Sequence, residues 1–241
     1  MRTTSAGYAL LPLLFLVAAC RSSETEPQPT RSGAGTPITE LAQGEDVPPG
    51  RYAAPFVGLE QDAVEAEVDV AEGFEKYDGS FLWNGSHDAS YGLSFWRITA
   101  VNPDPCRDNP PTYVDPGPSV RDLAMALRRQ PHRQGPGAIP VQLAGYEGLY
   151  LELELPKRFK PGRCASGSYE AWQAVHPKHQ STYDRYQYGP GFVDRIWILD
   201  VDGHRLVVNA THDPDITESD AATLDTMLKS ITIHTGEAAD D

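Results

Sequence analysis

The sequence predicts an α+β fold in which an antiparallel sheet carries two main helices packed on it. Three observations support this fold class. Apolar residues alternate with charged ones over residues 63–70, which is the period of a half-buried strand. Asp202-Gly203 separates two apolar runs, and Asp-Gly is a strong hairpin signal because both turn residues need a positive φ. Two further segments place apolar residues at helical spacing behind a Ser or Thr that can cap a helix.

The strands are expected in a simple order along the chain. The first begins at Gly50-Arg51-Tyr52, and residues 63–70 follow it. Residues 91–101 and 148–155 form the next two, and in the second of these every other residue is leucine. Residues 196–201 and 205–210 form the hairpin, and residues 230–234 form a closing strand. This order places the helices against one antiparallel sheet, as in an α+β sandwich.

Two helices are expected between these strands. The first begins after Ser119, has Asp122 in its first turn near the unpaired backbone amides, and ends before Pro131. Its buried stripe consists of Val120, Leu123, Ala124 and Leu127. The second begins at Thr217, again with acidic residues in its first turn. Its apolar face consists of Ala221, Leu224, Met227 and Leu228.

Residues 1–19 are predicted to be a secretory signal peptide. Arg2 supplies a positive charge, and an apolar run from Ala9 to Ala19 follows that is too short to span a bilayer. The run ends in Val17-Ala18-Ala19-Cys20, which resembles the lipobox of bacterial lipoproteins. The resemblance implies cleavage before Cys20 and a diacylglyceryl group on its thiol. We therefore expect a lipoprotein on the extracytoplasmic face of the cell membrane.

The rest of the chain is expected to consist of a tether, one domain and a tail. Residues 20–49 are rich in Ser, Glu, Thr, Pro and Gly, so they are expected to form a disordered tether. The length of the remaining chain favours a single globular α+β domain over residues 50–235. Residues 236–241 form a short acidic tail.

The charge of the chain limits its partners. It carries 20 Lys and Arg against 34 Asp and Glu, a formal net charge of −14 at pH 7. A field of that sign repels nucleic acid and anionic lipid headgroups. We therefore expect no nucleic-acid partner, and contact with the membrane through the lipid anchor only.

The cysteines fit an exported protein. Setting the lipidated Cys20 aside leaves Cys106 and Cys164 as a pair, and we expect a disulfide between them. The alternative is two free buried thiols. No CxxC redox motif is present, and neither cysteine has the ligand spacing of a zinc site.

Several short motifs are spread along the predicted domain. They are Gly50-Arg51-Tyr52, Gly92-Leu93-Ser94-Phe95-Trp96, Asp104-Pro105-Cys106, and Trp197-Ile198-Leu199-Asp200-Val201-Asp202-Gly203 followed by Arg205-Leu206-Val207-Val208. In these motifs the chain resembles a family of exported lipoproteins of high-GC Gram-positive bacteria. The resemblance implies a shared fold and brings no activity or catalytic residue. The order of the closing hairpin, helix and strand also resembles the Mog1/PsbP-type fold, which includes LpqN-type lipoproteins, but such an analogy transfers no function.

The candidate binding residues lie between Cys164 and Val193. They are Trp172, His176, His179, Tyr183, Tyr186 and Tyr188. The segment shows no clear strand period and ends at Gly189-Pro190-Gly191, so a long loop is expected, and long loops in compact domains are often functional. Its aromatic rings suit stacking on a glycan, a small molecule or an envelope protein. The alternative is that these rings pack the loop onto the sheet.

Metal and cofactor sites are not predicted. His176 and His179 are three residues apart, but Pro177 disfavours the helical turn that would bring them together, and Asp184 and Asp194 are the only candidates for further ligands. Asp200 and Asp202 resemble the start of a calcium loop, yet the following ligand positions are missing. Asp213 and Asp215 are interpreted as part of a polar loop before the second helix.

Catalytic residues are not assigned either. The chain contains no G-x-S-x-G, H-E-x-x-H, P-loop or Rossmann glycine motif. We expect a binding or accessory module of the cell envelope. The alternative is an envelope hydrolase of wall or capsule components, which a convergence of Asp184, Asp194 and His176 in one pocket would favour. Recognition of another protein through a sheet edge is a third possibility.

Overall fold

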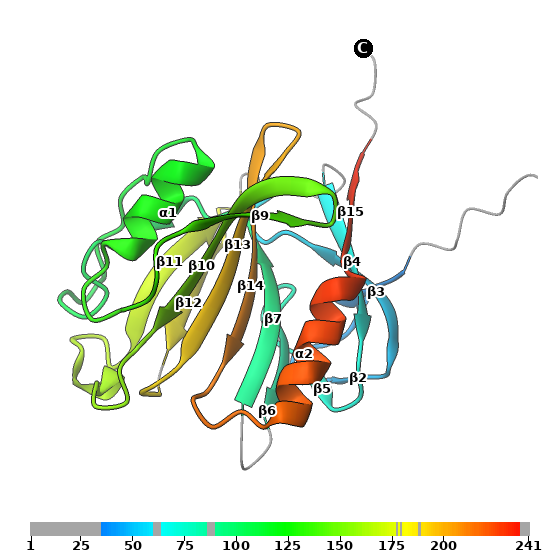
Figure 1. The fold of residues 1–241 in the computed structure, drawn as a ribbon, viewed down its shortest axis with the longest axis horizontal. Coiled ribbons are helices and arrows are strands. Elements are labelled where there is room, and N and C mark those ends of the chain that lie inside the picture. The colour runs from blue at the N-terminus through cyan, green and yellow to red at the C-terminus, as the bar shows by residue number, and fades with distance from the viewer. Residues whose placement is uncertain are drawn as a thin grey trace, which may run out of the picture. The chain divides into compact units, whose positions relative to one another are not determined.

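A central eight-stranded antiparallel sheet organises the computed structural model (Figure 1). The structure describes residues 35–59, 64–85, 90–176, 178, 180–187 and 189–236. In spatial order the central strands are β2 (Asp46–Val47), β5 (Phe74–Lys76), β6 (Leu82–Gly85), β7 (Ser90–Trp96), β14 (His204–His212), β13 (Val193–Val201), β10 (Tyr146–Glu154) and β9 (Ile139–Leu143). The α+β class predicted from the sequence is therefore correct.

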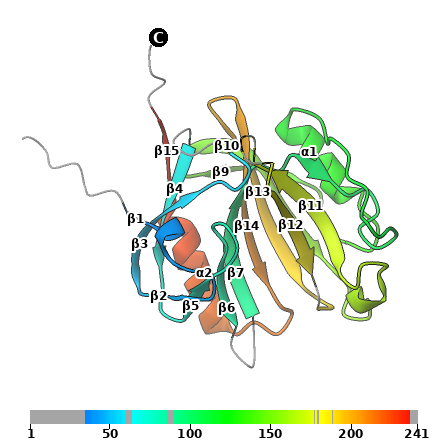
Figure 2. The ribbon, with the colours of Figure 1, turned by 180° about the vertical axis from the view of Figure 1, so that it is seen from behind.

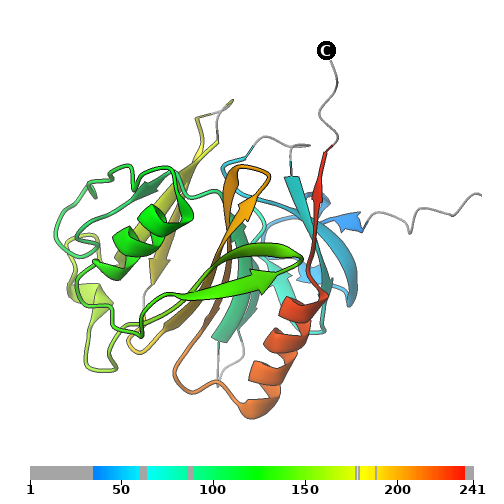
Figure 3. The same cartoon turned by 45° about the horizontal axis from the view of Figure 1, so that its top comes forward.

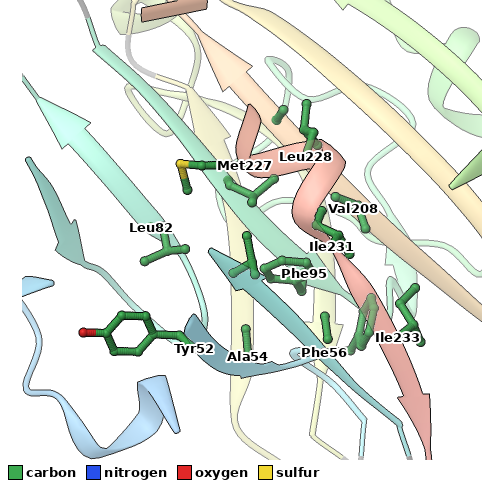
Figure 4. Packing of buried hydrophobic residues seen from close by; sticks show 14 of the residues in the cluster. Tyr52, Ala54, Phe56, Leu82, Phe95, Val208, Met227, Leu228, Ile231 and Ile233 are labelled. Atoms are coloured by element: carbon green, nitrogen blue, oxygen red, sulfur yellow. The ribbon is translucent and has the colours of Figure 1, made fainter. Parts of the chain in front are cut away.

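A four-stranded sheet and one helix cover the first face of the central sheet. The sheet has the order β1 (Thr36–Pro37), β3 (Gly50–Pro55), β4 (Val64–Val70) and β15 (Thr232–Thr235). The helix is α2 (Glu218–Ser230), and a short 3-10 turn, η1 (Ile38–Glu40), lies between β1 and β2. Side chains from these elements meet Phe95 and Val208 of the central sheet in one apolar core (Figure 4).

A three-stranded sheet and the other helix cover the second face. This sheet has the order β12 (Thr182–Gln187), β11 (Tyr169–Val175) and β8 (Ala100–Val101), and the helix is α1 (Val120–Arg128). A second 3-10 turn, η2 (Pro161–Arg163), precedes β11. Figures 1 and 2 show α1 and α2 on opposite sides of the central strands. Leu123 and Leu127 of α1 and Trp172 of β11 belong to a second, separate core.

The central strands are apolar on both faces because each face meets a core. On β13, Trp197, Leu199 and Val201 point into the first core, whereas Ile196 and Ile198 point into the second. Successive side chains of a strand point to opposite faces, so a strand covered on both sides reads as a continuous apolar run. The hairpin formed by β13 and β14 turns at Asp202-Gly203, where both residues have a positive φ, as the sequence predicts.

Both predicted helix starts are confirmed. The hydroxyl of Ser119 accepts a hydrogen bond from the backbone N–H of Asp122, and the carboxylate of Asp122 accepts one from the backbone N–H of Ser119. This is a reciprocal capping box. The hydroxyl of Thr217 accepts from the backbone N–H of Asp220 at the start of α2.

Three expectations are corrected. Residues 35–49, expected to belong to a disordered tether, are folded, because Ile38 and Val47 are buried in the first core and Glu67 accepts a hydrogen bond from the backbone N–H of Gly35. The single sheet is three sheets, since the predicted strand 91–101 leaves the central sheet after Trp96 and resumes as β8 beside β11. The segment between Cys164 and Val193, expected to form a long loop, contains the whole of β11 and of β12.

The expected covalent bridge is present. Cys106 and Cys164 form a disulfide that links the loop after β8 to the end of η2. Figure 3 shows α1 and the long loops beside it at one end of the domain. Among the described residues no helix is long and apolar enough to cross a membrane. The predicted signal peptide, Cys20 and the acidic tail from residue 237 lie outside the described residues.

Removal of the disulfide is expected to cost substantial stability. The bridge closes a loop of 58 residues, and the chain-entropy estimate for such a loop is about 4 kcal/mol. Replacing both Cys106 and Cys164 by Ala should lower the free energy of unfolding by that amount in urea denaturation. Reduction of the wild-type protein should give a similar loss. Alkylation mapping that finds both thiols free in the unreduced, denatured protein would contradict the bridge.

Candidate functional site

A cavity lies between β12 and the end of the central sheet formed by β5 and β6. Its volume is about 420 Å³, and we call it the aromatic pocket. All residues of β12 line it, together with the turn between β5 and β6 and the loop before β13. The aromatic residues that line it are Tyr77, Phe81, Trp83, Trp96, Tyr183, Tyr186 and Phe192.

The aromatic rings on the central-sheet side of the pocket contact one another. The rings of Tyr77 and Phe81 have centroids 6.1 Å apart, and those of Phe81 and Trp83 lie 5.5 Å apart. Trp83 stacks on Phe192 at 6.4 Å with an interplanar angle of 18°. Gly92 of β7 leaves the necessary room, since a Cβ there would lie 2.7 Å from Phe81 and 2.9 Å from Trp83. This wall is therefore an ordered run of aromatic faces.

A buried charge network, which we call the Asp194 network, lies behind β12. Asp194 of β13 accepts hydrogen bonds from the guanidinium groups of Arg133 and Arg185, and its bond from Arg185 measures 2.7 Å. Arg185 also donates to the hydroxyl of Thr211 at 2.9 Å. The side chains of Arg133 and Asp194 are fully buried. The network ties β12 to the central sheet.

The charge of Asp194 is retained in spite of its burial. Desolvation acts to raise the pKa of Asp194, but the positive charges of Arg185 and Arg133 outweigh it, so the pKa lies below its usual value. The guanidinium groups also lie over the ring of Trp172, 6.0 Å from its centroid for Arg185 and 5.6 Å for Arg133. Asp194 therefore keeps its negative charge at neutral pH, in contact with both guanidinium groups.

The pocket wall also contains a carboxylate, that of Asp184. Its carboxylate accepts hydrogen bonds from the hydroxyl of Tyr113 at 2.9 Å and from the amide of Gln173 at 3.0 Å. Desolvation raises the pKa of the Tyr113 hydroxyl, and the neighbouring charge of Asp184 raises it further. Tyr113 therefore stays a hydrogen-bond donor, and the Asp184 carboxylate is held by partners from outside the pocket.

The predicted binding residues are not brought together as one group. Tyr183 and Tyr186 line the aromatic pocket, and Tyr186 is 42% exposed. Trp172 is fully buried in the second core, where its ring meets that of Trp96 edge-on at 6.0 Å, so it does not present a face to solvent. His176 lies just after β11 and is not among the lining residues. His179 and Tyr188 lie outside the described residues.

Five of the seven aromatic residues that line the pocket were missed in the sequence. Tyr77, Phe81, Trp83 and Trp96 lie outside the segment between Cys164 and Val193, and Phe192 lies within it but was not named as a candidate. A signal exists in Phe81-Leu82-Trp83, where a buried Leu82 alternates with two aromatic residues on the other face of the strand. The strand is only four residues long, and its neighbour β5 only three, so neither gives a clear period.

The three residues whose convergence would favour the hydrolase alternative do not lie together. Asp184 lines the pocket, whereas Asp194 is buried behind β12 and His176 lies at the end of β11, so these three residues do not converge. Among the described residues, no group of three or more His, Cys, Asp or Glu side chains is placed to hold a metal ion. What the pocket does offer is flat aromatic faces with a few polar groups, the usual make-up of a small-molecule site.

The comparisons with known proteins assign no family to the chain. No protein-family model and no curated protein matches the chain, so the resemblance to a family of exported lipoproteins stays a prediction. The structure is similar to the crystal structure of LpqN of Mycobacterium tuberculosis, described as involved in cell envelope biogenesis. The identity is 12%, the TM-score is 0.32, and the match covers 83% of this chain and 99% of that one. Similarity at this level establishes neither a shared activity nor a shared ligand.

Asp194→Asn is expected to destabilise the protein. The substitution leaves two buried guanidinium groups without a counter-charge, which typically costs about 3–5 kcal/mol. Urea denaturation at pH 7 measures this loss. The control is Asp202→Asn in the exposed hairpin turn, where Asn also tolerates a positive φ and the change should stay within about 0.5 kcal/mol. Equal stability of Asp194→Asn and wild type at pH 7 would contradict the role of the network.

The same substitution has a defined pH dependence. Because the folded-state pKa of Asp194 lies below its unfolded value, its contribution is fully present above the unfolded pKa of about 4 and is lost as the pH falls through the folded pKa. The stability difference between wild type and Asp194→Asn should therefore shrink as the pH falls below about 4.

Proposed function

We propose that this chain is a lipid-anchored binding protein of the bacterial cell envelope, and that it holds a small amphipathic molecule in the aromatic pocket. The observation that carries the proposal is the pocket itself, with about 420 Å³ of space between ordered aromatic rings. Sites for small molecules usually have volumes of about 300–1,000 Å³ and combine apolar walls with a few polar groups. The pocket fits that description.

The chemistry of the walls favours a ligand with a flat or apolar body. Trp83 and Phe192 are already stacked, and Tyr186 presents a partly exposed ring on the opposite strand. A ring or chain placed between these walls is stabilised by burial of apolar area and by stacking. A sugar ring, an aromatic group or an alkyl chain meets this requirement, whereas a large protein surface does not enter a space of this size.

The location in the envelope is proposed from the sequence. The segment of residues 1–19 ends in a lipobox-like motif before Cys20, and the disulfide between Cys106 and Cys164 fits an oxidising compartment. The net charge of −14 is unfavourable for direct contact with anionic headgroups, so a lipid anchor supplies the attachment.

The pocket is tested by a ligand screen with the purified protein. We expect saturation-transfer NMR to find small glycosides, aromatic compounds or alkyl amphiphiles that bind and compete with one another. Tyr186→Ala should weaken their binding by about 1–3 kcal/mol, roughly 5- to 150-fold, because it removes one aromatic face. The melting temperature should change little, since the Tyr186 side chain is 42% exposed.

Ile139→Ala is the matched control for this substitution. Ile139 is also exposed and apolar, but it lies on β9 at the far edge of the central sheet and does not line the pocket. Its replacement should leave the affinities unchanged. A screen without any compound whose binding depends on Tyr186 would refute the proposed pocket function.

The anchor is tested independently by Cys20→Ala. This substitution removes the thiol that would carry the lipid, so labelling with a palmitate analogue should be abolished in a bacterial host. The protein should also move from the detergent phase to the aqueous phase in detergent phase separation. Unchanged partitioning of Cys20→Ala would show that the membrane attachment has another origin.

A further inference from the structure

The aromatic pocket runs along the edge of β12 rather than along one of its faces. All six residues of this strand, Thr182–Gln187, line the pocket. Successive side chains of a strand point to opposite faces, so a cavity on one face is lined by every other residue. A cavity that is lined by consecutive residues therefore lies beside the edge. The sheet order β12-β11-β8 leaves this edge without a neighbouring strand in the described structure.

Two residues of β12 direct their backbone groups toward this edge. The backbone carbonyl of Gln173 on β11 accepts from the backbone N–H of Thr99 at 3.0 Å, so Gln173 points away from β12. Asp184 lies opposite Gln173, and opposite residues of an antiparallel pair point their backbone groups either both inward or both outward. The N–H and C=O of Asp184 therefore point to the open edge. Thr182 does the same, because it lies opposite Val175, whose backbone N–H donates to the hydroxyl of Thr99.

These edge groups are available for pairing. In the part of the chain that the structure describes, the backbone N–H and C=O of Thr182 and Asp184 have no hydrogen-bond partner. The two residues alternate along the edge with the spacing of an antiparallel ladder. An extended peptide that lies along the edge can therefore pair with both residues and extend the three-stranded sheet by one strand.

The edge of β12 lacks the features that protect most of the other sheet edges. Natural proteins protect an exposed edge by making the strand short, by placing proline in it or by covering it. The edge strands β1, β2 and β8 have two residues each, and β9 contains Pro140. Strand β12 has six residues and no proline. Its edge is therefore the one that suits strand addition.

A strand added to β12 would lie on aromatic rings of the central sheet. Arg185 of β12 donates to Asp194 of β13 and to Thr211 of β14, so β12 lies over these two strands. The next strands of the central sheet are β7 and β6. Trp96 of β7 and Trp83 of β6 line the pocket on this side. Side chains of an added strand that point toward the central sheet would therefore meet indole rings, which favours apolar or aromatic residues.

The opposite face of the added strand would meet a carboxylate. Because side chains alternate along β12, Asp184 lies on the other face from Arg185. Its hydrogen bonds from Tyr113 and Gln173 both end on Oδ1 and come from neutral groups. Its Oδ2 has no hydrogen-bond partner among the described residues, yet it is not buried, so it is open to a cation. Asp78 adds a second, exposed carboxylate to the lining.

We infer that the edge of β12 binds an extended peptide segment in which apolar or aromatic residues alternate with lysine or arginine. This inference rests on the proposed pocket function and names the class of ligand. The peptide runs antiparallel to β12, as do all pairs of the three-stranded sheet. A basic residue lies opposite Asp184, where its backbone pairs with that of Asp184 and its side chain meets the carboxylate. The apolar residues on either side of it face Trp83.

The first test compares two peptides of one composition. Isothermal titration calorimetry at pH 7 should show acetyl-Lys-Phe-Lys-Phe-Lys-amide binding at least about tenfold more tightly than acetyl-Lys-Lys-Lys-Phe-Phe-amide, which has the same charge but no alternation. This comparison separates strand addition from the general attraction of a cation to an acidic protein. The alternating peptide should also displace the compounds found in the ligand screen.

Backbone methylation of the alternating peptide tests the pairing itself. N-methylation of the central lysine removes an N–H that faces β12 in every register in which two lysines pair with Thr182 and Asp184. The affinity should fall at least about tenfold, because the methyl group also prevents close approach of the strands. N-methylation of one phenylalanine is the matched control. Its N–H points away from β12, so the affinity should change less than about threefold.

Asp184→Asn tests the position of the basic residue. The Oδ1 of the new amide still accepts from Tyr113 and Gln173, so the melting temperature should change little. The alternating lysine peptide should lose about fivefold or more in affinity, whereas acetyl-Gln-Phe-Gln-Phe-Gln-amide should not weaken. Asp202→Asn removes the same charge from an exposed turn outside the pocket and should change the affinity less than about twofold, because solvent screens it.

The failures of this inference and of the pocket function are distinguishable. Equal affinities of the two methylated peptides would overturn strand addition, and so would an absence of peptide binding in a protein that binds screened compounds through Tyr186. Both results leave the pocket function intact. Peptide binding that is unchanged in Asp184→Asn would overturn the position of the basic residue. A protein that sediments as a dimer and is dissociated by the peptide would assign the edge to a second copy of this chain instead.

Discussion

The burial of Asp194 between two guanidinium groups is the constraint on which the second layer of this fold depends. Asp194 belongs to β13 in the middle of the central sheet, Arg185 to β12, and Arg133 to the segment after α1. Three charges buried separately would each carry a large desolvation cost, whereas together they compensate one another in part. The three-stranded sheet and the segment after α1 are therefore held at one position over the central sheet. Apolar contacts have no preferred direction, so they alone do not specify that position.

This constraint also shapes the pocket. Strand β12 is an edge strand that pairs with β11 on one side, and its residues line the pocket. The opposite wall, with Phe81 and Trp83, belongs to the central sheet. Because the Asp194 network fixes the distance between these two layers, it also fixes the width of the pocket. A site whose walls are set in the free protein loses little conformational entropy when a ligand binds, so more of the contact energy appears as affinity.

The fold was more predictable from the sequence than the site, because the signals for the fold are local and those for the site are not. The capped helices, the Asp-Gly hairpin and the alternating β4 are local patterns, and all are found in the structure. Strand β12 was missed because its inward residues Arg185 and Gln187 are polar, so its alternation does not appear as apolar against polar. Trp172 was assigned to a ligand, but an aromatic residue on an irregular-looking segment gives no indication of the face on which it lies. The wall from Phe81 to Phe192 joins residues far apart in the chain, which one sequence does not pair.

The surface and the pocket wall carry charge of the same sign. The net charge of −14 acts over the surface, where mobile ions screen it within about 8–10 Å at physiological ionic strength. Asp78 and Asp184 line the pocket, and the guanidinium of Arg185 beside them is already paired with the buried carboxylate of Asp194. The hydrogen bonds that Asp184 accepts from Tyr113 and Gln173 come from neutral donors, so they orient its carboxylate without cancelling its charge. The polar part of the wall therefore does not favour an anion, and the attraction of the pocket for a ligand comes mainly from its aromatic faces.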